Sequence, residues 1–177
     1  ALVAHLLPNA DPVAKVTIVS RGAMGGYTKY LPEDDRHLWS LTQFKDHMAT
    51  AMGGRVAEET TFGGEEITTG ASNDLENATH MAREMVTRYG MSEKLGPRTF
   101  GQKQEMVFLG REITEQRDYS DHVAEEIDQE VRAVIHHAYA RADQIIVDNP
   151  EKLAEVANYL IQHESVEGEA LVRLFNG

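Results

Sequence analysis

The stretch from Ser120 to Asp148 constrains the fold more than any other part of the sequence. Its apolar residues recur every three or four positions, which is the spacing of one face of an α-helix. That face consists of Val123, Ile127, Val131, Val134, Ile135, Ala138, Ala142, Ile145 and Ile146. A helix with such a stripe must bury it against other elements. The sequence therefore predicts a long amphipathic helix that begins after a capping Ser120 and ends before Asn149-Pro150.

Shorter patterns complete the expected fold. Further helices are predicted over Ala1 to Leu7, Leu41 to Thr60, Ala71 to Tyr89, Glu151 to His163 and Gly168 to Phe175. Two short strands are predicted over Lys15 to Ser20 and Tyr27 to Leu31, and the stretch from Gly96 to Asp118 is predicted to be a loop. We therefore expect a mainly α fold with one small β-hairpin or short sheet near the N-terminus, and no second domain.

Gly53 and Gly54 interrupt the helix predicted from Leu41 to Thr60. A glycine inside a helix costs about 1 kcal/mol relative to alanine. The pair has two interpretations, which the pattern alone does not separate. It marks either a break in the helix or a close approach of another backbone.

Composition excludes several classes of protein. The 177 residues contain no cysteine, which excludes disulfide frameworks, thiolate metal sites and cysteine nucleophiles. The 17 basic and 29 acidic residues give a net charge of −12, which repels a phosphate backbone, so we expect no nucleic-acid partner. No apolar run is long enough to cross a bilayer. The nucleotide-binding patterns GxxxxGK[ST] and GxGxxG and the esterase pattern GxSxG are also absent.

The eight histidines do not form a recognisable zinc motif. They are His5, His37, His47, His80, His122, His136, His137 and His163. None pairs with another four residues away, the spacing that lets two imidazoles on one helix reach the same zinc ion. Taken singly, each is interpreted as a surface or packing residue.

Asp74 is the acidic residue that fits its surroundings least. In the predicted helix it shares a face with Ala78, Met81 and Met85. A carboxylate on an apolar face must be paired, protonated, metal-bound or engaged in capping. Its place in the first turn favours capping when the pattern is considered alone.

Glu58 also lies on the predicted buried side of its helix. The simplest interpretation is a salt bridge, to Arg55 or to Arg83. The neighbouring Glu59 is expected to be an ordinary solvated acid.

Several segments occur in an order that is typical of one protein family. They are Ala1-Leu2-Val3-Ala4, Asp11-Pro12, Lys15-Val16-Thr17-Ile18-Val19-Ser20-Arg21-Gly22, Gly53-Gly54-Arg55-Val56-Ala57-Glu58-Glu59, Thr69-Gly70-Ala71-Ser72-Asn73-Asp74-Leu75, Met85-Val86-Thr87-Arg88-Tyr89-Gly90-Met91-Ser92, Leu95-Gly96-Pro97, Val107-Phe108-Leu109-Gly110-Arg111 and Ile127-Asp128-Gln129-Glu130-Val131. Over nearly its whole length the chain resembles the peptidase domain of the FtsH family, which comprises membrane-anchored ATP-dependent zinc metalloproteases.

The resemblance implies roles for particular residues. By motif, Asp74 is the third protein ligand of zinc. The family's two histidine ligands and its general-base glutamate belong to a HEAGH motif that would directly precede Ala1, so no catalytic residue is expected within this chain. Glu58 is expected to orient a ligand histidine. We expect the strand Val16, Thr17, Ile18, Val19 to border the substrate cleft and to pair with an extended peptide.

The resemblance also implies a larger protein around this chain. Residues 1–177 would form the peptidase domain without the start of its zinc-motif helix, and ATP and Mg would bind in an ATPase domain outside the sequence. The parent protein would be a membrane-bound homo-hexamer that degrades unfolded and membrane proteins, with this domain on the cytoplasmic, matrix or stromal side. The chain alone is expected to be inactive. The alternative is a noncatalytic helical module for ring assembly or partner binding.

Overall fold

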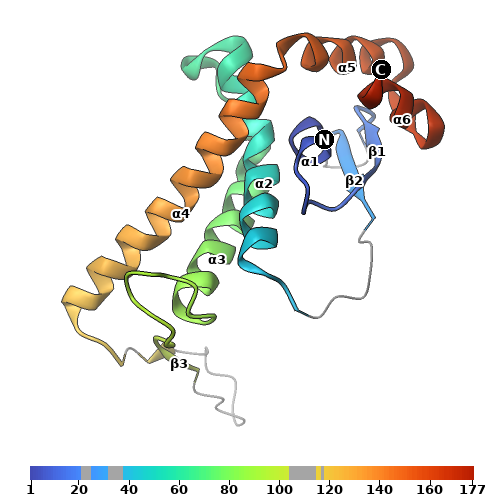
Figure 1. Ribbon diagram of the computed structural model, residues 1–177. Helices are drawn as coiled ribbons and strands as arrows, with labels where there is room; N and C mark the ends of the chain where they lie inside the picture. Colours follow the sequence, from blue (N-terminus) through green and yellow to red (C-terminus); the bar gives the residue numbers. More distant parts are fainter. Residues whose placement is uncertain (21–24, 32–37, 104–114, 117) are drawn as a thin grey trace, which may run out of the picture. The chain divides into compact units, whose positions relative to one another are not determined.

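A computed structural model describes the chain except for residues 21–24, 32–37, 104–114 and 117 (Figure 1). The described residues form a mainly α-helical fold, which confirms the expected class. The helices are α1 (Leu2–Leu6), α2 (Leu41–Phe62), α3 (Ser72–Thr87), α4 (Asp121–Asp148), α5 (Pro150–His163) and α6 (Gly168–Asn176). Two single-turn 3₁₀ helices, η1 (Gly64–Glu66) and η2 (Thr69–Ala71), connect α2 to α3. The family-like segments at residues 21–22 and 107–111 lie outside the described residues.

Two compact units divide the chain. The first consists of residues 1–75 and 137–177, and the second of residues 76–136. The divisions fall inside α3 and α4, so each of these helices contributes to both units.

A small antiparallel sheet belongs to the first unit. It contains β1 (Val13–Thr17), β2 (Tyr27–Tyr30) and β5 (Ser165–Glu167) in the order β2-β1-β5. The predicted hairpin is therefore present, but it gains a third strand from the C-terminal part of the chain. That strand is three residues long, too short for an alternating pattern to reveal it.

The order of the strands corrects one expectation. Val16 pairs with Thr28 of β2 on one side and with Val166 of β5 on the other, and Thr17 is likewise paired on both sides. The argument that Val16 to Val19 forms a free edge for a peptide is therefore wrong for Val16 and Thr17. It failed because periodicity identifies a strand but not its neighbours.

Helix α2 continues through its two glycines. A Cβ atom on Gly53 would lie 3.0 Å from Val3 Cγ2 in α1, whereas one on Gly54 would meet no atom within 4 Å. Close packing is therefore the correct interpretation for Gly53, although the neighbour is the side chain of Val3 and not a backbone, and the helix break is wrong. Since Val3 is almost completely buried, this contact fixes α1 against α2. The start of α2 is closed by a reciprocal capping box between Ser40 and Gln43.

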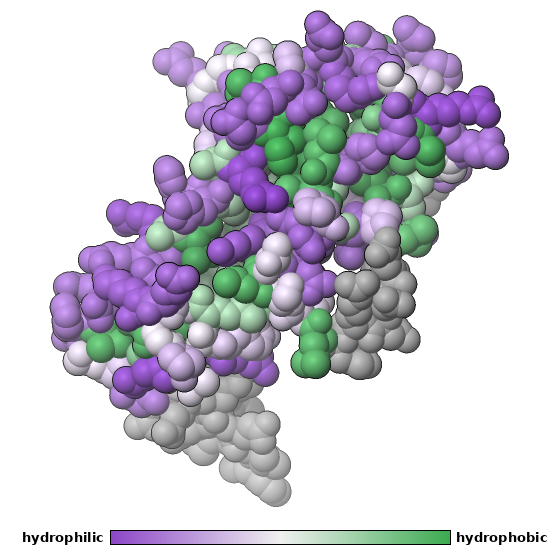
Figure 2. All heavy atoms as spheres, viewed as in Figure 1, coloured by the Kyte–Doolittle hydropathy of each residue, from purple (hydrophilic) through white to green (hydrophobic). Residues whose placement is uncertain are grey.

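The core of the first unit joins segments from both ends of the chain. Its buried apolar residues are Leu2, Val3, Ala4, Leu7, Val16, Met48, Ala49, Met52, Val56, Ala71, Ala138, Ala142, Ile146, Val156, Leu160, Val166, Leu171, Leu174 and Phe175. On the face shown in Figure 2, hydrophilic side chains dominate the surface and hydrophobic atoms appear in patches between them. The acidic composition is therefore carried by a solvated surface around an ordinary apolar core.

A buried acid lies within this core. Asp46 of α2 is 1% exposed. Its Oδ2 atom accepts hydrogen bonds from the backbone N–H and the side-chain amide of Asn9, at 3.1 and 2.9 Å. Its Oδ1 atom lies 3.2 Å from a guanidinium nitrogen of Arg141 in α4. One carboxylate thus connects the turn after α1, α2 and the C-terminal half of α4.

In the second unit, the loop that follows α3 is hydrogen-bonded to α4. Gly90 ends the α3 segment with φ +61°, as expected for a glycine after a helix. Ser92 Oγ donates to Glu130 at 2.6 Å. Two short strands, β3 (Gln102–Lys103) and β4 (Glu115–Gln116), pair antiparallel within the stretch predicted to be a loop, so that prediction is wrong for these residues.

The start and end of α4 agree with the prediction. The Val123 N–H donates to Ser120 Oγ at 3.3 Å, which confirms the cap. Asn149 separates α4 from α5, which begins at Pro150. Among the described helices, none combines the length and the apolar character needed to cross a membrane.

Candidate metal and substrate site

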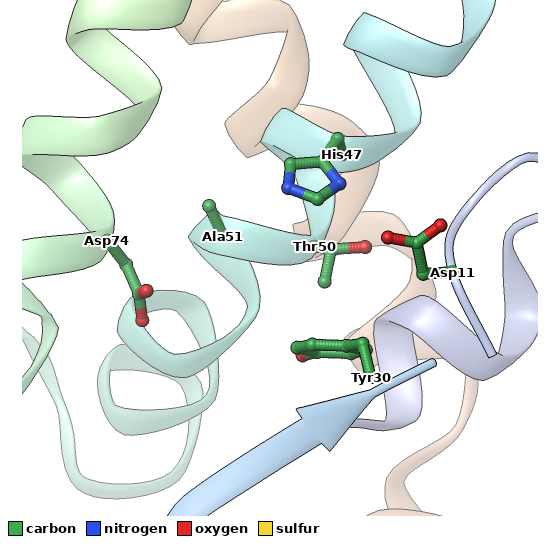
Figure 3. A pocket seen from close by; sticks show the side chains of 6 residues that line it. All are labelled: Asp11, Tyr30, His47, Thr50, Ala51 and Asp74. Atoms are coloured by element: carbon green, nitrogen blue, oxygen red, sulfur yellow. The ribbon is translucent and has the colours of Figure 1, made fainter. Parts of the chain in front are cut away.

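Four segments of the first unit surround a small pocket (Figure 3). Its volume is 110 Å³, and it is lined by Asp11, Tyr30, His47, Thr50, Ala51 and Asp74. The aspartates come from the turn after α1 and from the first turn of α3, the tyrosine ends β2, and the other three residues lie on α2. The fold therefore brings two carboxylates, an imidazole and two hydroxyls to one place.

Asp74 reaches this pocket with a free carboxylate. The side chain is exposed, and no described residue gives it a hydrogen bond. Partial loss of hydration raises the pKa of this carboxyl group, while the charged N-terminus acts in the opposite direction. A capping acid would accept backbone N–H bonds, so the capping interpretation finds no support in the hydrogen bonds.

The amino group of Ala1 lies within electrostatic reach of Asp74. Burial lowers the pKa of this amino group to about 6, and the Asp74 carboxylate opposes the shift. Any residue joined to the Ala1 nitrogen would consequently begin close to Asp74. This is where the FtsH resemblance expects the histidine ligands to arrive.

Glu58 accepts hydrogen bonds from the segment that connects α2 to α3. Thr68 donates to it twice, from Oγ1 to Oε1 at 2.6 Å and from its backbone N–H to Oε2 at 3.2 Å. Thr68 Oγ1 also accepts the Gly70 N–H at 3.1 Å, at the start of η2. The two bonds from Thr68, followed by a smaller effect of Arg55, lower the pKa of the Glu58 carboxyl group. Glu58 therefore supports the turn that precedes Asp74.

The ion pair expected for Glu58 is formed by its neighbour instead. Arg55 Nε lies 3.8 Å from Glu59 Oε2. The Tyr139 hydroxyl donates to the same Glu59 oxygen at 2.7 Å, which raises the pKa of Tyr139 to about 12. The expectation that Glu59 is merely solvated is wrong, because α4 supplies a partner that helix periodicity does not reveal.

Replacement of Glu58 tests its hold on the turn. Glu58→Gln keeps an acceptor for Thr68 but loses the charge, so we expect a lower denaturation midpoint at pH 7 than in the wild type, and a larger loss for Glu58→Ala. Because the folded-state pKa lies below the ordinary 4.5, the stabilisation is complete above that value and disappears as the pH falls through the folded pKa. The difference between wild type and Glu58→Gln, measured by denaturant unfolding from pH 7 to pH 3, should therefore shrink. A constant difference over this range would contradict the assignment.

The described histidines are surface or packing residues, as interpreted: most of them are exposed, and His37 lies outside the described residues. His5 lies against Phe175 with ring centroids 4.8 Å apart, and His163 stacks on Tyr159 at 4.2 Å. His47 packs edge-on against Trp39 at 4.9 Å, yet it also lines the pocket. Within the part of the chain that the structure describes, no three histidine or acidic side chains are grouped closely enough to hold a metal ion.

Sequence reasoning missed most of the pocket. Asp11, Tyr30, His47 and Thr50 each carry no local signal, because the pocket arises only when β2 and the turn after α1 pack near α2. That Val16 to Val19 border the substrate cleft stays a prediction. The outer strands of the described sheet, however, are β2 and β5, not β1, and β2 ends at the pocket residue Tyr30.

Comparison with known proteins identifies the family. The sequence profile described as Peptidase family M41 matches residues 1–174. The chain belongs to peptidase family M41. It is 56% identical over 176 residues to ATP-dependent zinc metalloprotease FtsH 1 of Thermomicrobium roseum and 57% identical over 176 residues to the protein of the same name from Sphaerobacter thermophilus. The FtsH protein of Chloroflexus aggregans is 54% identical over 175 residues.

These M41 relatives are much longer proteins. The matches cover 98–99% of the chain but 27% of each of the three relatives. The resemblance to FtsH-type zinc metalloproteases is thus confirmed at the level of the family and of this region.

Proposed function

We propose that this M41 chain is the proteolytic region of an ATP-dependent zinc metalloendopeptidase and that Asp74 is one of its zinc ligands. The observation that carries the proposal is the Asp74 carboxylate, which is exposed, has no hydrogen bond from the described residues, and lies within electrostatic reach of the Ala1 nitrogen. The relatives are named zinc metalloproteases, which makes zinc the metal to consider.

The chemistry of Asp74 fits a zinc site. Zinc in proteins accepts carboxylate oxygen together with imidazole nitrogen, and catalytic sites use three protein ligands and leave one position open. This chain would contribute the carboxylate, and a HEAGH sequence joined to Ala1 would contribute two imidazoles. Zinc bound there would polarise the scissile carbonyl and lower the pKa of a water molecule. The turn held by Glu58 would keep Asp74 directed at that position.

The outer edge of β2 is our candidate for the peptide-binding edge. An extended peptide adds to a sheet through main-chain hydrogen bonds, and β2 is an outer strand of the described sheet. A peptide along β2 would pass Tyr30 and so reach the pocket that Asp74 lines. The pairing with a peptide first expected of Val16 and Thr17 is thereby transferred to the neighbouring strand β2, whereas bordering the cleft stays a prediction for Val16 to Val19.

The proposal extends to the longer protein around the chain. We infer a membrane-anchored homo-hexamer whose ATPase domain, with ATP and Mg, feeds unfolded or membrane proteins to this region. The names of the relatives support the dependence on ATP. The net charge of −12 opposes close association of isolated copies at low salt, so other parts of the protein would help hold the ring together.

The experiment compares two chains. The 177-residue chain should neither retain stoichiometric zinc nor hydrolyse casein. The same chain, preceded by a helical segment that ends in His-Glu-Ala-Gly-His, should retain about one zinc per subunit and hydrolyse casein in a chelator-sensitive manner. Zinc content by atomic emission and release of labelled casein fragments are the measurements.

Each chain has an outcome that would count against the proposal. Zinc-dependent hydrolysis by the purified 177-residue chain would show that the ligands lie elsewhere. A folded extended chain that retains no zinc would favour the noncatalytic assembly module instead.

A further inference from the structure

We propose that the pocket beside Asp74 binds a positively charged side chain, lysine or arginine, of a peptide, with the Asp11 carboxylate as its ionic partner. That this peptide is the substrate rests on the proposed function, whereas the preference of the pocket for a cation does not. The inference follows from which polar groups line the pocket and which of them have partners.

Asp11 brings an unused negative charge to the pocket. The described residues give its carboxylate neither a hydrogen bond nor an ion pair. Its charge nevertheless acts inside the pocket. It opposes the larger effect of burial, which lowers the pKa of His47. It adds to the larger effect of burial, which raises the pKa of Tyr30. A cation that entered the pocket would therefore meet an uncompensated carboxylate.

Thr50 provides a second, independent sign of a missing partner. Its residue lines the pocket, and its hydroxyl oxygen is buried and has no hydrogen-bond partner among the described residues. A buried hydroxyl without a partner is costly. Figure 3 shows this oxygen directed toward the side of the pocket where Asp11 lies. An ammonium or guanidinium group held by Asp11 would donate a hydrogen bond to it.

No described residue that lines the pocket supplies a positive charge at neutral pH. Burial lowers the pKa of His47 below its ordinary 6.5, so its imidazole is uncharged there. Besides the carboxylates of Asp11 and Asp74, the remaining lining groups are the phenol of Tyr30, the hydroxyl of Thr50 and the methyl group of Ala51. The volume of 110 Å³ is of the order of the roughly 150 Å³ cavity that holds one benzene ring, so the pocket admits a single side chain.

The position of Asp11 relative to Asp74 relates the pocket to the proposed zinc site. In Figure 3 the two carboxylates lie at opposite ends of the pocket, with Tyr30 and Ala51 between them. Both carboxylates raise the pKa of Tyr30, which agrees with its intermediate place. With a lysine side chain anchored at Asp11, the backbone of the peptide would lie on the side of Tyr30 and Asp74. A peptide paired with β2 would run along the same side.

The test measures peptide binding by the 177-residue chain, without proteolysis. The probes are acetyl-Gly-Lys-Gly-amide, its neutral isostere with norleucine, and its acidic analogue with glutamate, titrated at low salt and followed by NMR signals of Thr50 and Ala51. We expect the lysine peptide to bind about tenfold more tightly than the norleucine peptide, because one hydrogen bond to a charged group changes an affinity by about tenfold or more. The glutamate peptide should be the weakest.

Variants separate Asp11 from general charge. Asp11→Asn should abolish the preference for lysine, whereas Asp148→Asn, which removes the same charge from an exposed position outside the pocket, should preserve it. Thr50→Val should weaken binding of the lysine peptide and raise the denaturation midpoint of the free chain, because it removes an unpartnered hydroxyl. Equal binding of lysine and norleucine peptides, or an unchanged preference in Asp11→Asn, would overturn the inference.

The result is distinguishable from a failure of the proposed function. A lysine preference that depends on Asp11, in a chain whose extended form binds no zinc, supports the cation pocket and removes the protease. Zinc-dependent casein hydrolysis without any lysine preference supports the protease and overturns the pocket.

Discussion

Asp74→Asn, introduced into the chain extended by the HEAGH segment, should remove most of the bound zinc and lower casein hydrolysis by more than 100-fold. A neutral amide oxygen is a much poorer zinc ligand than a carboxylate. Loss of a residue that only orients a ligand costs about 10–100-fold in metal affinity or activity, so loss of the ligand itself should exceed that range. Zinc per subunit after dialysis and the initial rate of casein hydrolysis measure the effect.

The same substitution distinguishes the ligand from a helix cap. Asparagine is about as good a cap as aspartate, so helix content and thermal unfolding of the metal-free protein should remain unchanged. Glu76→Gln, a loss of one charge at an exposed position two residues further along α3, should leave zinc and activity intact. Normal zinc occupancy in Asp74→Asn would return Asp74 to a local role in the helix.

The fold could be predicted where the information is local. The periodic apolar face of residues 120–148 predicted α4, and the sequence also carried a start signal at Ser120 and a stop signal at Asn149-Pro150. Gly53 was correctly singled out, but only the structure shows that Val3 is the reason. The third strand, β5, escaped prediction because its partner β1 lies at the other end of the sequence.

The residues of the candidate site likewise fall into those that a local pattern reveals and those that it does not. Asp74 and Glu58 were found because each is an acid on an apolar helix face, and a family resemblance then suggested their roles. Asp11 and Thr50 offered no such conflict, since an aspartate before a proline and a threonine within a helix are unremarkable. Their significance depends on the hydrogen-bond or ionic partners that they lack among the described residues of the folded chain. A pattern within one segment of the sequence does not reveal this.

Asp46 is the most consequential residue that the sequence conceals. It stands between Lys45 and His47 and so looks like part of a solvated helix face, yet it is 1% exposed. Asp46→Ala should lower the free energy of unfolding by about 3 kcal/mol, because it removes the hydrogen bonds from Asn9 and the ion pair with Arg141. Urea unfolding followed by circular dichroism measures the change.

Two further substitutions show how Asp46 acts. Asp46→Asn keeps one oxygen for Asn9 but turns an amide toward the guanidinium of Arg141, so we expect an intermediate loss of about 1–2 kcal/mol. Glu169→Ala removes an ion pair with Arg173 whose side chains are 91% and 80% exposed, and should cost less than about 0.5 kcal/mol. If Asp46→Ala cost no more than Glu169→Ala, water would be replacing its partners, and the junction of α1, α2 and α4 would be held by apolar packing alone.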